Sequence, residues 1–232
     1  MKRYAAIILA AGSGRRLNLG YNKIFYAIDG IPIIIHAIRP FFHDPHCKQL
    51  LIVGKDDEMD SLKRLLQAHH LHDERTLYVP GGTERQHSVY NGLQQVKEEI
   101  VLIHDGARPF ITPQLISTLY DKAKAVGAAV PGYPVKETIK VVQQRQIVKT
   151  LDRSVLYQVQ TPQAIQTALI KKAHDWARQE GVLLTDDVSL VEHYHLSPVI
   201  VVDSSPMNIK ITTPTDLIIA RAIYEHERTG GQ

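Results

Sequence analysis

The sequence AAIILAAGSGRRLNLGYNK, residues 5–23, contains the strongest structural signal in the chain. The apolar run from Tyr4 to Leu9 is too short for a helix and has no polar interruption, which predicts a strand buried on both faces of a parallel sheet. In the loop of small residues that follows, Gly12 and Gly14 let backbone N–H groups approach a ligand closely. Beside this loop lie three cations, Arg15, Arg16 and Lys23. A strand followed by such a loop suits a polyphosphate.

The loop matches neither of the two common glycine-rich nucleotide motifs. A dinucleotide-binding fold requires a third glycine where Leu17 stands, and no Gly-Lys-Ser/Thr sequence follows as in a P-loop. A Gly-x-Gly sequence alone is more often a tight turn between a strand and a helix, with two solvated arginines. The rest of the chain must therefore decide whether a ligand binds here.

Composition excludes several classes of protein. With 232 residues and 44% hydrophobic content, the chain is long enough for one large or two small domains. The net charge of +3 arises from 27 basic and 24 acidic residues without a basic block, which argues against a nucleic-acid-binding arm. The single cysteine, Cys47, excludes an internal disulfide and a multi-cysteine metal site. The sequence shows no signal-peptide pattern and no run of membrane-spanning length, so we expect a cytoplasmic protein without a membrane partner.

Strand and helix signals alternate through the first half of the chain. After the glycine loop, buried strands are predicted at residues 49–53, 76–79 and 100–104. The helices predicted between and after them cover 30–41, 56–69 (capped by Asp56 and Asp57), 84–97 and 112–127. Repeated strand–helix–strand units predict a Rossmann-like α/β fold, with a mostly parallel sheet and helices on both faces.

The second half of the chain departs from this pattern. Residues 135–151 are rich in β-forming residues but too polar for a central strand, which predicts an exposed hairpin or arm at about 136–153. A merely solvated hairpin is almost as consistent with the sequence as an arm exchanged between subunits. Further strands are predicted at 155–160, 198–203 and 208–212, and helices at 164–180, 186–194 and from Pro214 onward. Since no linker or repeat interrupts the chain, we predict a single domain over 1–232 with a projecting β-arm.

Polar residues follow several of the predicted strands. Ligands of doubly wound sheets bind beyond the carboxyl ends of the strands, which would bring residues 81–88 and 104–109 together with the glycine loop. A carboxylate that faces a phosphate-binding loop is what Mg²⁺ requires, and Asp105 is the candidate. Alternatively, Asp105 caps the next turn and pairs with Arg108. Asp186 and Asp187 are as consistent with a helix N-cap as with ligand binding.

Eight segments, taken in order, resemble a known family. They read AAGSGRRL (with Lys23), GGTERQHSV, HDGARPF, PVKETIK, LDRSVL, QTPQ, TDDVSLVE and NIKITTPTDL. This series is similar to the nucleotidyltransferase-type cytidylyltransferases, and among them to the 2-C-methyl-D-erythritol 4-phosphate cytidylyltransferase family, from about Tyr4 to Ala222. Ribitol-5-phosphate cytidylyltransferases share several of these motifs, but the segments around Arg153 and Thr185 favour the erythritol family.

The resemblance implies an enzyme of isoprenoid biosynthesis that transfers CMP from CTP to 2-C-methyl-D-erythritol 4-phosphate and releases pyrophosphate. A phosphate monoester has a second pKa near 6, so the attacking oxygen is already ionised at neutral pH and needs no general base. The difficulty is to bring two polyanions together, which requires positioned cations and Mg²⁺. A non-catalytic nucleotide-binding sensor with the same fold is the alternative of a different class.

The resemblance also assigns roles to individual residues. The residues expected to bind the triphosphate and promote the reaction are Ala10, Ala11, Gly12, Ser13, Gly14, Arg16, Lys23 and Lys210. Cytosine recognition is implied for Gly82, Thr83 and Ser88, and Mg²⁺ binding for Asp105. Contacts with the ribose and the alcohol phosphate are implied for Gly106, Arg108, Thr138, Arg153, Thr161 and Thr185. Thr83 stands where the family pattern leads us to expect an aspartate, so base recognition here would lack one charge.

In relatives, the arm crosses to a second subunit. The resemblance therefore implies a homodimer in which Thr138 and Arg153, the latter also expected to be catalytic, complete the site of the neighbouring subunit. Retention of Lys23, Asp105 and Lys210 argues against a sensor without activity.

Overall fold

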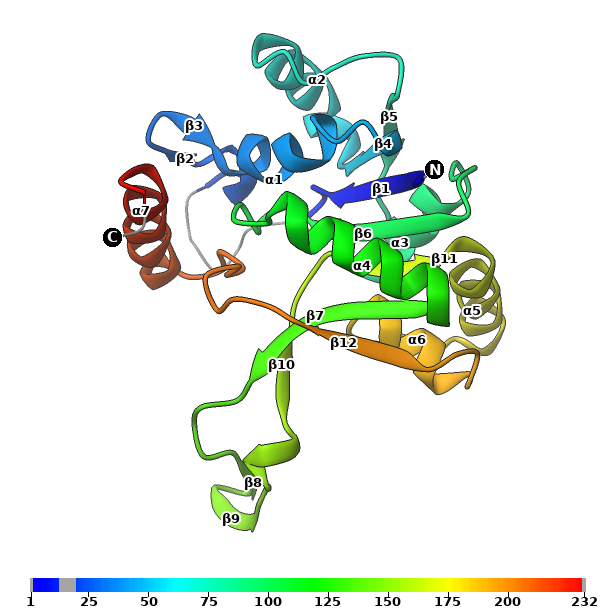
Figure 1. Ribbon diagram of the computed structural model, residues 1–232, viewed down its shortest axis with the longest axis vertical. Helices are drawn as coiled ribbons and strands as arrows, with labels where there is room; N and C mark the ends of the chain where they lie inside the picture. The colour runs from blue at the N-terminus through cyan, green and yellow to red at the C-terminus, as the bar shows by residue number, and fades with distance from the viewer. Residues whose placement is uncertain (1, 13–19, 231–232) are drawn as a thin grey trace.

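The computed structural model describes residues 2–12 and 20–230, which form a mixed, mostly parallel sheet covered by helices (Figure 1). Strand β1 (Tyr4–Leu9) lies between β4 (Cys47–Gly54) and β6 (Ile100–Asp105) and runs parallel to both. Beyond β4, β5 (Thr76–Pro80) continues the parallel order. Every residue of β6 is buried, as expected of a strand covered on both faces.

The other half of the sheet contains antiparallel pairs. Strand β11 (Gln163–Gln166) lies antiparallel between β6 and β7 (Ala128–Pro134). Further along β7, β10 (Tyr157–Val159) also pairs antiparallel, whereas β12 (Val199–Asp203) pairs parallel to β7. The predicted fold class, a Rossmann-like and mostly parallel sheet, is confirmed.

Helices cover both faces of this sheet because successive strand residues point to opposite sides. In β1, Ala6 and Ile8 belong to one buried cluster, whereas Ala5 and Ile7 belong to the other. The first cluster includes residues of α1 (Ile33–Phe42), α2 (Met59–Ala68) and α4 (Pro113–Val126). The second includes residues of α3 (Arg85–Leu93), α5 (Thr167–Glu180) and α6 (Asp187–His193).

A smaller third cluster lies beside the sheet. It joins α7 (Pro214–Arg228) to β2 (Ala27–Ile28), which pairs with the short strand β3 (Ile31–Pro32). Three 3-10 turns occur in the described residues: η2 (Lys23–Phe25), η3 (Asp56–Glu58) and η4 (Arg153–Val155).

Several predicted helix ends are confirmed by their hydrogen bonds. Thr112 caps α4 by accepting from the Leu115 N–H, and Gly127 follows the last residue of that helix. Asp186 caps α6 by accepting from the Ser189 N–H, so the structural role considered for this aspartate is observed. Helix α7 begins with Pro214, as predicted from the sequence.

Other predicted boundaries are wrong. Residues 208–212 are a loop, not a strand, and the helix predicted at 164–180 begins only at Thr167, after β11. Asp56 and Asp57 do not cap α2: they lie in η3, and the residue before α2, Glu58, makes no side-chain cap. Helix α3 ends at Leu93, four residues before the predicted end.

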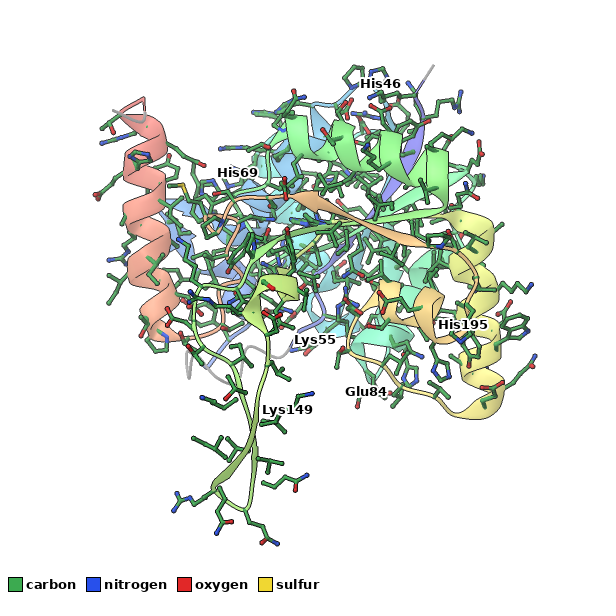
Figure 2. The ribbon with its side chains drawn as sticks, turned by 60° about the horizontal axis from the view of Figure 1, so that its bottom comes forward. His46, Lys55, His69, Glu84, Lys149 and His195 are labelled. Carbon is green, nitrogen blue, oxygen red and sulfur yellow. The ribbon has the colours of Figure 1, made fainter. Side chains whose placement is uncertain are left out.

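The predicted arm is a hairpin that projects from the sheet (Figure 1). Strands β8 (Lys140–Gln143) and β9 (Gln146–Thr150) pair only with each other among the described residues. Their two-residue turn, Gln144 and Arg145, has positive φ angles of 45° and 68°, as a type I′ turn requires. Figure 2 shows Lys149 on this hairpin, well away from the body of the molecule.

Within residues 2–12 and 20–230, no helix combines the length and the apolar character needed to cross a bilayer.

Candidate functional site

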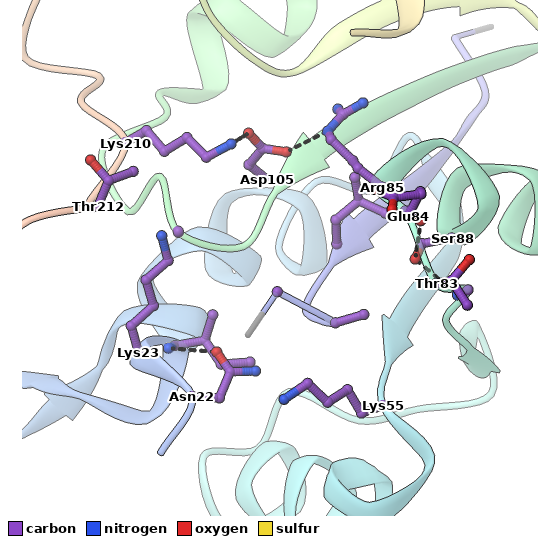
Figure 3. Close-up of a pocket in the computed structure, with 16 residues that line it drawn as sticks. Asn22, Lys23, Lys55, Thr83, Glu84, Arg85, Ser88, Asp105, Lys210 and Thr212 are labelled. Carbon is purple, nitrogen blue, oxygen red and sulfur yellow. Dashed lines mark hydrogen bonds and ion pairs between the residues drawn. The ribbon is translucent and has the colours of Figure 1, made fainter. Parts of the chain in front are cut away.

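A cavity of about 810 Å³ opens beyond the carboxyl ends of β1, β4, β5 and β6 (Figure 3). We call it the central cavity. It is lined by residues of several segments that are distant in sequence, as predicted for a doubly wound sheet. Among its lining residues are Ala11, Gly12, Asn22, Lys23, Lys55, Gly82, Thr83, Arg85, Ser88, Asp105, Lys210 and Thr212. Three residues that we expected to lie together, Lys23, Asp105 and Lys210, all line this cavity.

Asp105 lies between two cations in this cavity (Figure 3). Its Oδ1 atom is 3.2 Å from Arg85 Nε, and its Oδ2 atom is 2.7 Å from Lys210 Nζ. Burial by itself would raise the pKa of Asp105, but Arg85 and Lys210 hold it well below its usual range. The carboxylate is therefore ionised at neutral pH. The pairing of its side chain with Arg108, considered from the sequence, is not among the observed ion pairs of the described residues.

Arg85, the first residue of α3, links Asp105 to Asp187. Its Nη1 and Nη2 atoms donate to the two carboxylate oxygens of Asp187 at 3.0 and 2.7 Å. Because Asp187 is buried, this bidentate pair fixes the position of the Arg85 guanidinium at the cavity wall. Arg85 was not among the predicted site residues, although it stands two residues after Thr83 in a segment predicted to bind ligand.

The backbone of Asp105 is held by a chain of hydrogen bonds. Its N–H donates to Thr161 Oγ1, which lies 3.0 Å from His104 Nδ1, and His104 Nε2 lies 3.0 Å from the Arg108 carbonyl oxygen. Because burial lowers the pKa of His104 to about 4, the ring is neutral. A carbonyl can only accept, so Nε2 carries the proton and Nδ1 accepts from the Thr161 hydroxyl. Thr161 therefore supports Asp105 from behind and does not line the cavity.

Lys23 also lines the cavity, and its side chain is buried, with 9% of the residue exposed. It begins η2, and Asn22 immediately before it accepts from the Ile24 N–H. The Asn22 amide also donates to the Ala10 carbonyl at 2.8 Å and to Glu58 Oε2 at 2.7 Å. These contacts tie η2 to the end of β1. Lys55, which we did not predict from the sequence, also lines the central cavity. Its Nζ atom lies 3.2 Å from Glu58 Oε1.

The segment predicted to recognise the base forms another wall. The Gly82 N–H donates to Ser88 Oγ at 3.0 Å, and Ser88 Oγ donates to the Glu84 carbonyl at 3.1 Å. Thr83 Oγ1 lies 2.9 Å from His87 Nδ1. A Cβ atom at position 82 would lie 2.3 Å from His87 Cβ, so only glycine fits there. The wall is thus built largely from backbone and small side chains.

Several predicted site residues lie outside the lining of the central cavity. Ala10 is buried, and Gly106 packs so closely against Ile34 and Leu9 that a side chain would clash. Arg108 donates to the Asn208 carbonyl at 2.7 Å, while its buried Nε has no hydrogen-bond partner among the described residues. The exposed residues are Thr138, Arg153 and Thr185. Predictions for Ser13, Gly14 and Arg16 concern residues outside the described part of the chain.

The cavity suits a magnesium ion as part of a nucleotide complex. Among residues 2–12 and 20–230, no group of three or more His, Cys, Asp and Glu side chains could hold a metal by itself. Asp105 offers one carboxylate, and its oxygens keep further lone pairs beside the contacts with Arg85 and Lys210. Mg²⁺ commonly takes one or two protein carboxylates and completes its octahedron with phosphate oxygens and water. The donor set therefore fits an ion that arrives with a triphosphate.

The mostly parallel sheet and the cation-lined cavity at its strand ends define the class of α/β nucleotidyltransferases. Comparison with known proteins narrows this class. Residues 4–226 match the 2-C-methyl-D-erythritol 4-phosphate cytidylyltransferase family, and the chain belongs to it.

Relatives with this name match the chain over almost its full length. The protein from Bacillus velezensis is 46% identical over 225 residues, which cover 97% of each chain. The protein from Geobacillus kaustophilus is 46% identical over 221 residues, 95% of this chain and 96% of the relative. Among solved structures, the 4-diphosphocytidyl-2C-methyl-D-erythritol synthase of Anaerococcus prevotii is 30% identical, with a TM-score of 0.86 and coverage of 97% and 96%. These similarities support the resemblance predicted from the eight segments.

Proposed function

We propose that this protein transfers CMP from CTP to 2-C-methyl-D-erythritol 4-phosphate, forming 4-diphosphocytidyl-2-C-methyl-D-erythritol and pyrophosphate. The observation that carries the proposal is the joint placement of Lys23, Asp105 and Lys210 around one cavity, in a chain that matches the family from residue 4 to 226. The cavity volume of about 810 Å³ lies within the usual range for small-molecule sites.

In this proposal, charge neutralisation promotes the reaction. The alcohol phosphate attacks the α-phosphorus through an oxygen that is already ionised, the bond to the β-phosphate oxygen breaks, and pyrophosphate leaves with the electron pair. Lys23 and Lys210 stabilise the charge that develops on the phosphate oxygens, and Arg16 joins them. The backbone of the glycine loop, including Ser13 and Gly14, donates N–H groups to the triphosphate.

Asp105 would hold Mg²⁺, which supplies further neutralisation of the phosphate charge when it is bound. Support comes from the ionised state of Asp105 and from its position on the cavity wall. Lys210, at 2.7 Å from the same carboxylate, would then lie beside both the metal and the reacting phosphate. Arg85 and Asp187 would fix the orientation of the carboxylate.

Cytosine recognition is proposed for Gly82, Thr83 and Ser88. The close approach of Gly82 to His87 and the bond from Gly82 N–H to Ser88 Oγ hold this wall in one conformation. A narrow wall of backbone atoms favours a pyrimidine over the larger purines. Thr83 offers a hydroxyl in place of a carboxylate, so recognition at this position depends on hydrogen bonds without a charge.

A homodimer joined through the arm is also part of the proposal. The arm exposes four branched apolar side chains, Val141, Val142, Ile147 and Val148. Exposed apolar patches of this kind commonly mark interaction sites. Arg153, whose Nη1 donates to the Lys136 carbonyl, lies at the base of the arm and would enter the neighbouring site together with Thr138.

Contacts with the ribose and the alcohol phosphate are proposed for Gly106, Arg108, Thr161 and Thr185. These roles follow from the family resemblance alone.

The decisive assay is pyrophosphate release from Mg·CTP in the presence of one alcohol phosphate at a time. We expect turnover with 2-C-methyl-D-erythritol 4-phosphate and little with ribitol 5-phosphate. Turnover with ribitol 5-phosphate alone would assign the chain to that reaction. CTP binding without turnover on either substrate would indicate a sensor.

The cytoplasmic location remains a prediction, which cell fractionation can test.

A further inference from the structure

A second cavity, of about 490 Å³, lies between α3 and α5. We call it the helix-pair cavity. The two helices pack against the same face of the sheet (Figure 1), and the cavity is closed by the turn at 82–83 and by the segment 181–183. The proposed reaction uses no residue that is found in this cavity except Gly82 and Thr83.

His174 of α5 gives the helix-pair cavity an unmet hydrogen-bonding need. Its side chain is 2% exposed, and Nε2 has no partner among the described residues. Burial lowers the pKa of His174 to about 4, with Arg85 and His87 adding positive charge nearby, so the ring is neutral. Buried polar atoms are almost always hydrogen-bonded in folded proteins. A ligand or water that enters the cavity supplies the missing partner once the His174 ring turns toward it.

Arg178 gives the same cavity a positive charge. Its Nη1 donates to the Tyr90 hydroxyl at 3.2 Å, and its guanidinium lies 5.2 Å from the centre of the Tyr90 ring. No Asp or Glu is found in the lining of this cavity, and none pairs with Arg178 within the described chain. A guanidinium has five donors and binds planar carboxylates in a bidentate manner, so most of its capacity remains for an anion.

The remaining walls are partly apolar. Ala177, Val182 and Leu183 line the cavity, and Leu183 is 55% exposed, which is high for a leucine beside a cavity. A ligand with an apolar body would cover this side chain and remove it from water. The charge of a single guanidinium matches a monoanion better than a polyphosphate.

We propose that the helix-pair cavity binds a small carboxylic acid with an aromatic or branched apolar body. Its carboxylate pairs with Arg178, a polar atom meets the need at His174, and its apolar body packs on Ala177 and Leu183. No covalent step is involved.

This site shares a wall with the central cavity. Gly82 and Thr83 line both cavities, and His87, which lines the helix-pair cavity, lies 2.9 Å from the Thr83 hydroxyl through Nδ1. An anion on one side of this turn repels a nucleotide on the other, and it can draw His87 away from Thr83. Occupation of the helix-pair cavity therefore weakens CTP binding, and by thermodynamic reciprocity CTP weakens binding of the acid.

The first experiment measures binding of benzoate to the full chain by ligand-observed NMR titration, with benzamide as its neutral counterpart of the same shape. We expect saturable binding of benzoate, at least about threefold tighter than benzamide, since a charge pair with the exposed Arg178 is worth a factor of that order. The variant Arg178→Gln, changed at an exposed position, should bind benzoate more weakly than the unmodified protein by a similar factor. Equal binding of the two probes, or no saturable benzoate binding, would overturn the proposal.

Matched variants locate the site. Lys172→Gln removes a cation from the same helix outside the cavity, and Lys23→Ala removes one from the central cavity; both should leave benzoate binding unchanged. A loss of binding in Lys23→Ala but not in Arg178→Gln would place benzoate in the central cavity and overturn the assignment. His174→Phe should also bind benzoate more weakly, and thermal unfolding checks that this variant folds. Unchanged benzoate binding would contradict the role of His174 in the site.

The second experiment tests communication with the central cavity. Saturating benzoate should raise the dissociation constant of Mg·CTP at least about fivefold in the unmodified protein, the lower end of typical coupling, and have no effect in Arg178→Gln. Benzoate binding that leaves CTP affinity unchanged would refute the coupling. Because benzoate binding is measured without CTP, a protein that fails to use CTP still tests the site.

Discussion

Asp105 carries its charge inside the central cavity because Arg85 and Lys210 lie on either side of it. Asp105→Asn keeps the shape of the side chain and removes the charge. We expect metal-dependent pyrophosphate release to fall by about two orders of magnitude or more, as when a positioned charge-stabilising group is lost. Unfolding in urea should show a loss of about 1–3 kcal/mol, because two cations lose their counterion. A normal rate would contradict the role of Asp105.

Lys23 lies at the same cavity but makes a different contribution. We expect Lys23→Ala to lower turnover by about 10²–10³-fold, because the triphosphate loses a cation. Lys23 is more deeply buried than the sequence implied, yet its stem adds little to the three apolar clusters, so the unfolding temperature should change by only a few degrees. Lys63→Ala, at a half-buried position on α2 outside the cavity lining, is the control and should retain full activity. Equal losses of activity and stability in Lys23→Ala would indicate a structural role.

Two buried histidines make stability depend on pH. Burial lowers the pKa values of His104 and His174 to about 4, so between about pH 6.5 and 4 the unfolded chain binds protons that the folded chain does not. Stability therefore falls as the pH is lowered through that range. For Asp105, whose folded pKa is depressed, the stabilising contribution is present above about pH 4 and is lost only at lower pH.

The variant His174→Phe isolates one of these contributions. Between pH 7 and 5, the unmodified protein should lose about 2 kcal/mol more unfolding free energy than His174→Phe, as linkage gives for one such histidine. Urea unfolding at pH 7, 6 and 5 measures the slope. His226→Gln on α7, which replaces an exposed histidine, should keep the slope of the unmodified protein. Parallel slopes for all three proteins would show that His174 accepts a proton in the folded state.

The joint placement of Lys23, Asp105 and Lys210 could be predicted mainly because the family motifs contain all three residues. Strand geometry helps only for Asp105, which ends β6 at the edge of the sheet where ligands of such folds bind, whereas Lys23 lies in a 3-10 turn and Lys210 in a loop. Arg85 could not be assigned in the same way. Its importance depends on Asp187, 102 residues later in the chain, and on the start of α3, which places the Arg85 side chain at the cavity wall.

Among the elements, β7 and β11 were missed for local reasons. Strand β7 contains Pro131 and Gly132, which are depleted in strands, and β11 has only four residues before α5 begins. The alternating sequence at 208–212 predicted a strand, but the segment is held by side chains instead. Asn208 donates to the Thr161 carbonyl and accepts from Arg108 through its own carbonyl. Such long-range contacts override the local pattern.

The arm leads to a prediction about exchange between subunits. If Arg153 completes the site of a neighbouring subunit, Arg153→Ala and Lys23→Ala disable different parts of each shared site. Mixed dimers of the two inactive variants then contain one intact site, so mixing after mild dissociation should restore up to about one quarter of the activity in a statistical mixture. Pyrophosphate release measures the recovery. No recovery, although mixed dimers form, would show that each chain builds its own site.

On the scale of the whole molecule, the two main apolar clusters lie on opposite faces of one sheet and share its strands. Neither cluster can be lost without exposing the other face of the same strands, so we predict a single cooperative domain over residues 1–232. Urea unfolding followed by circular dichroism and by fluorescence of Trp176 should give coincident transitions. Two separate transitions would indicate two domains.

The proposed reaction depends on a single site at the central cavity, formed by segments that are distant in sequence. A crystal structure with CTP and Mg²⁺ tests it most directly. We expect the triphosphate in the central cavity, within hydrogen-bonding distance of Lys23 and Lys210, the metal on Asp105, and cytosine against Gly82 and Ser88. A nucleotide bound elsewhere, or a metal that does not contact Asp105, would contradict the account.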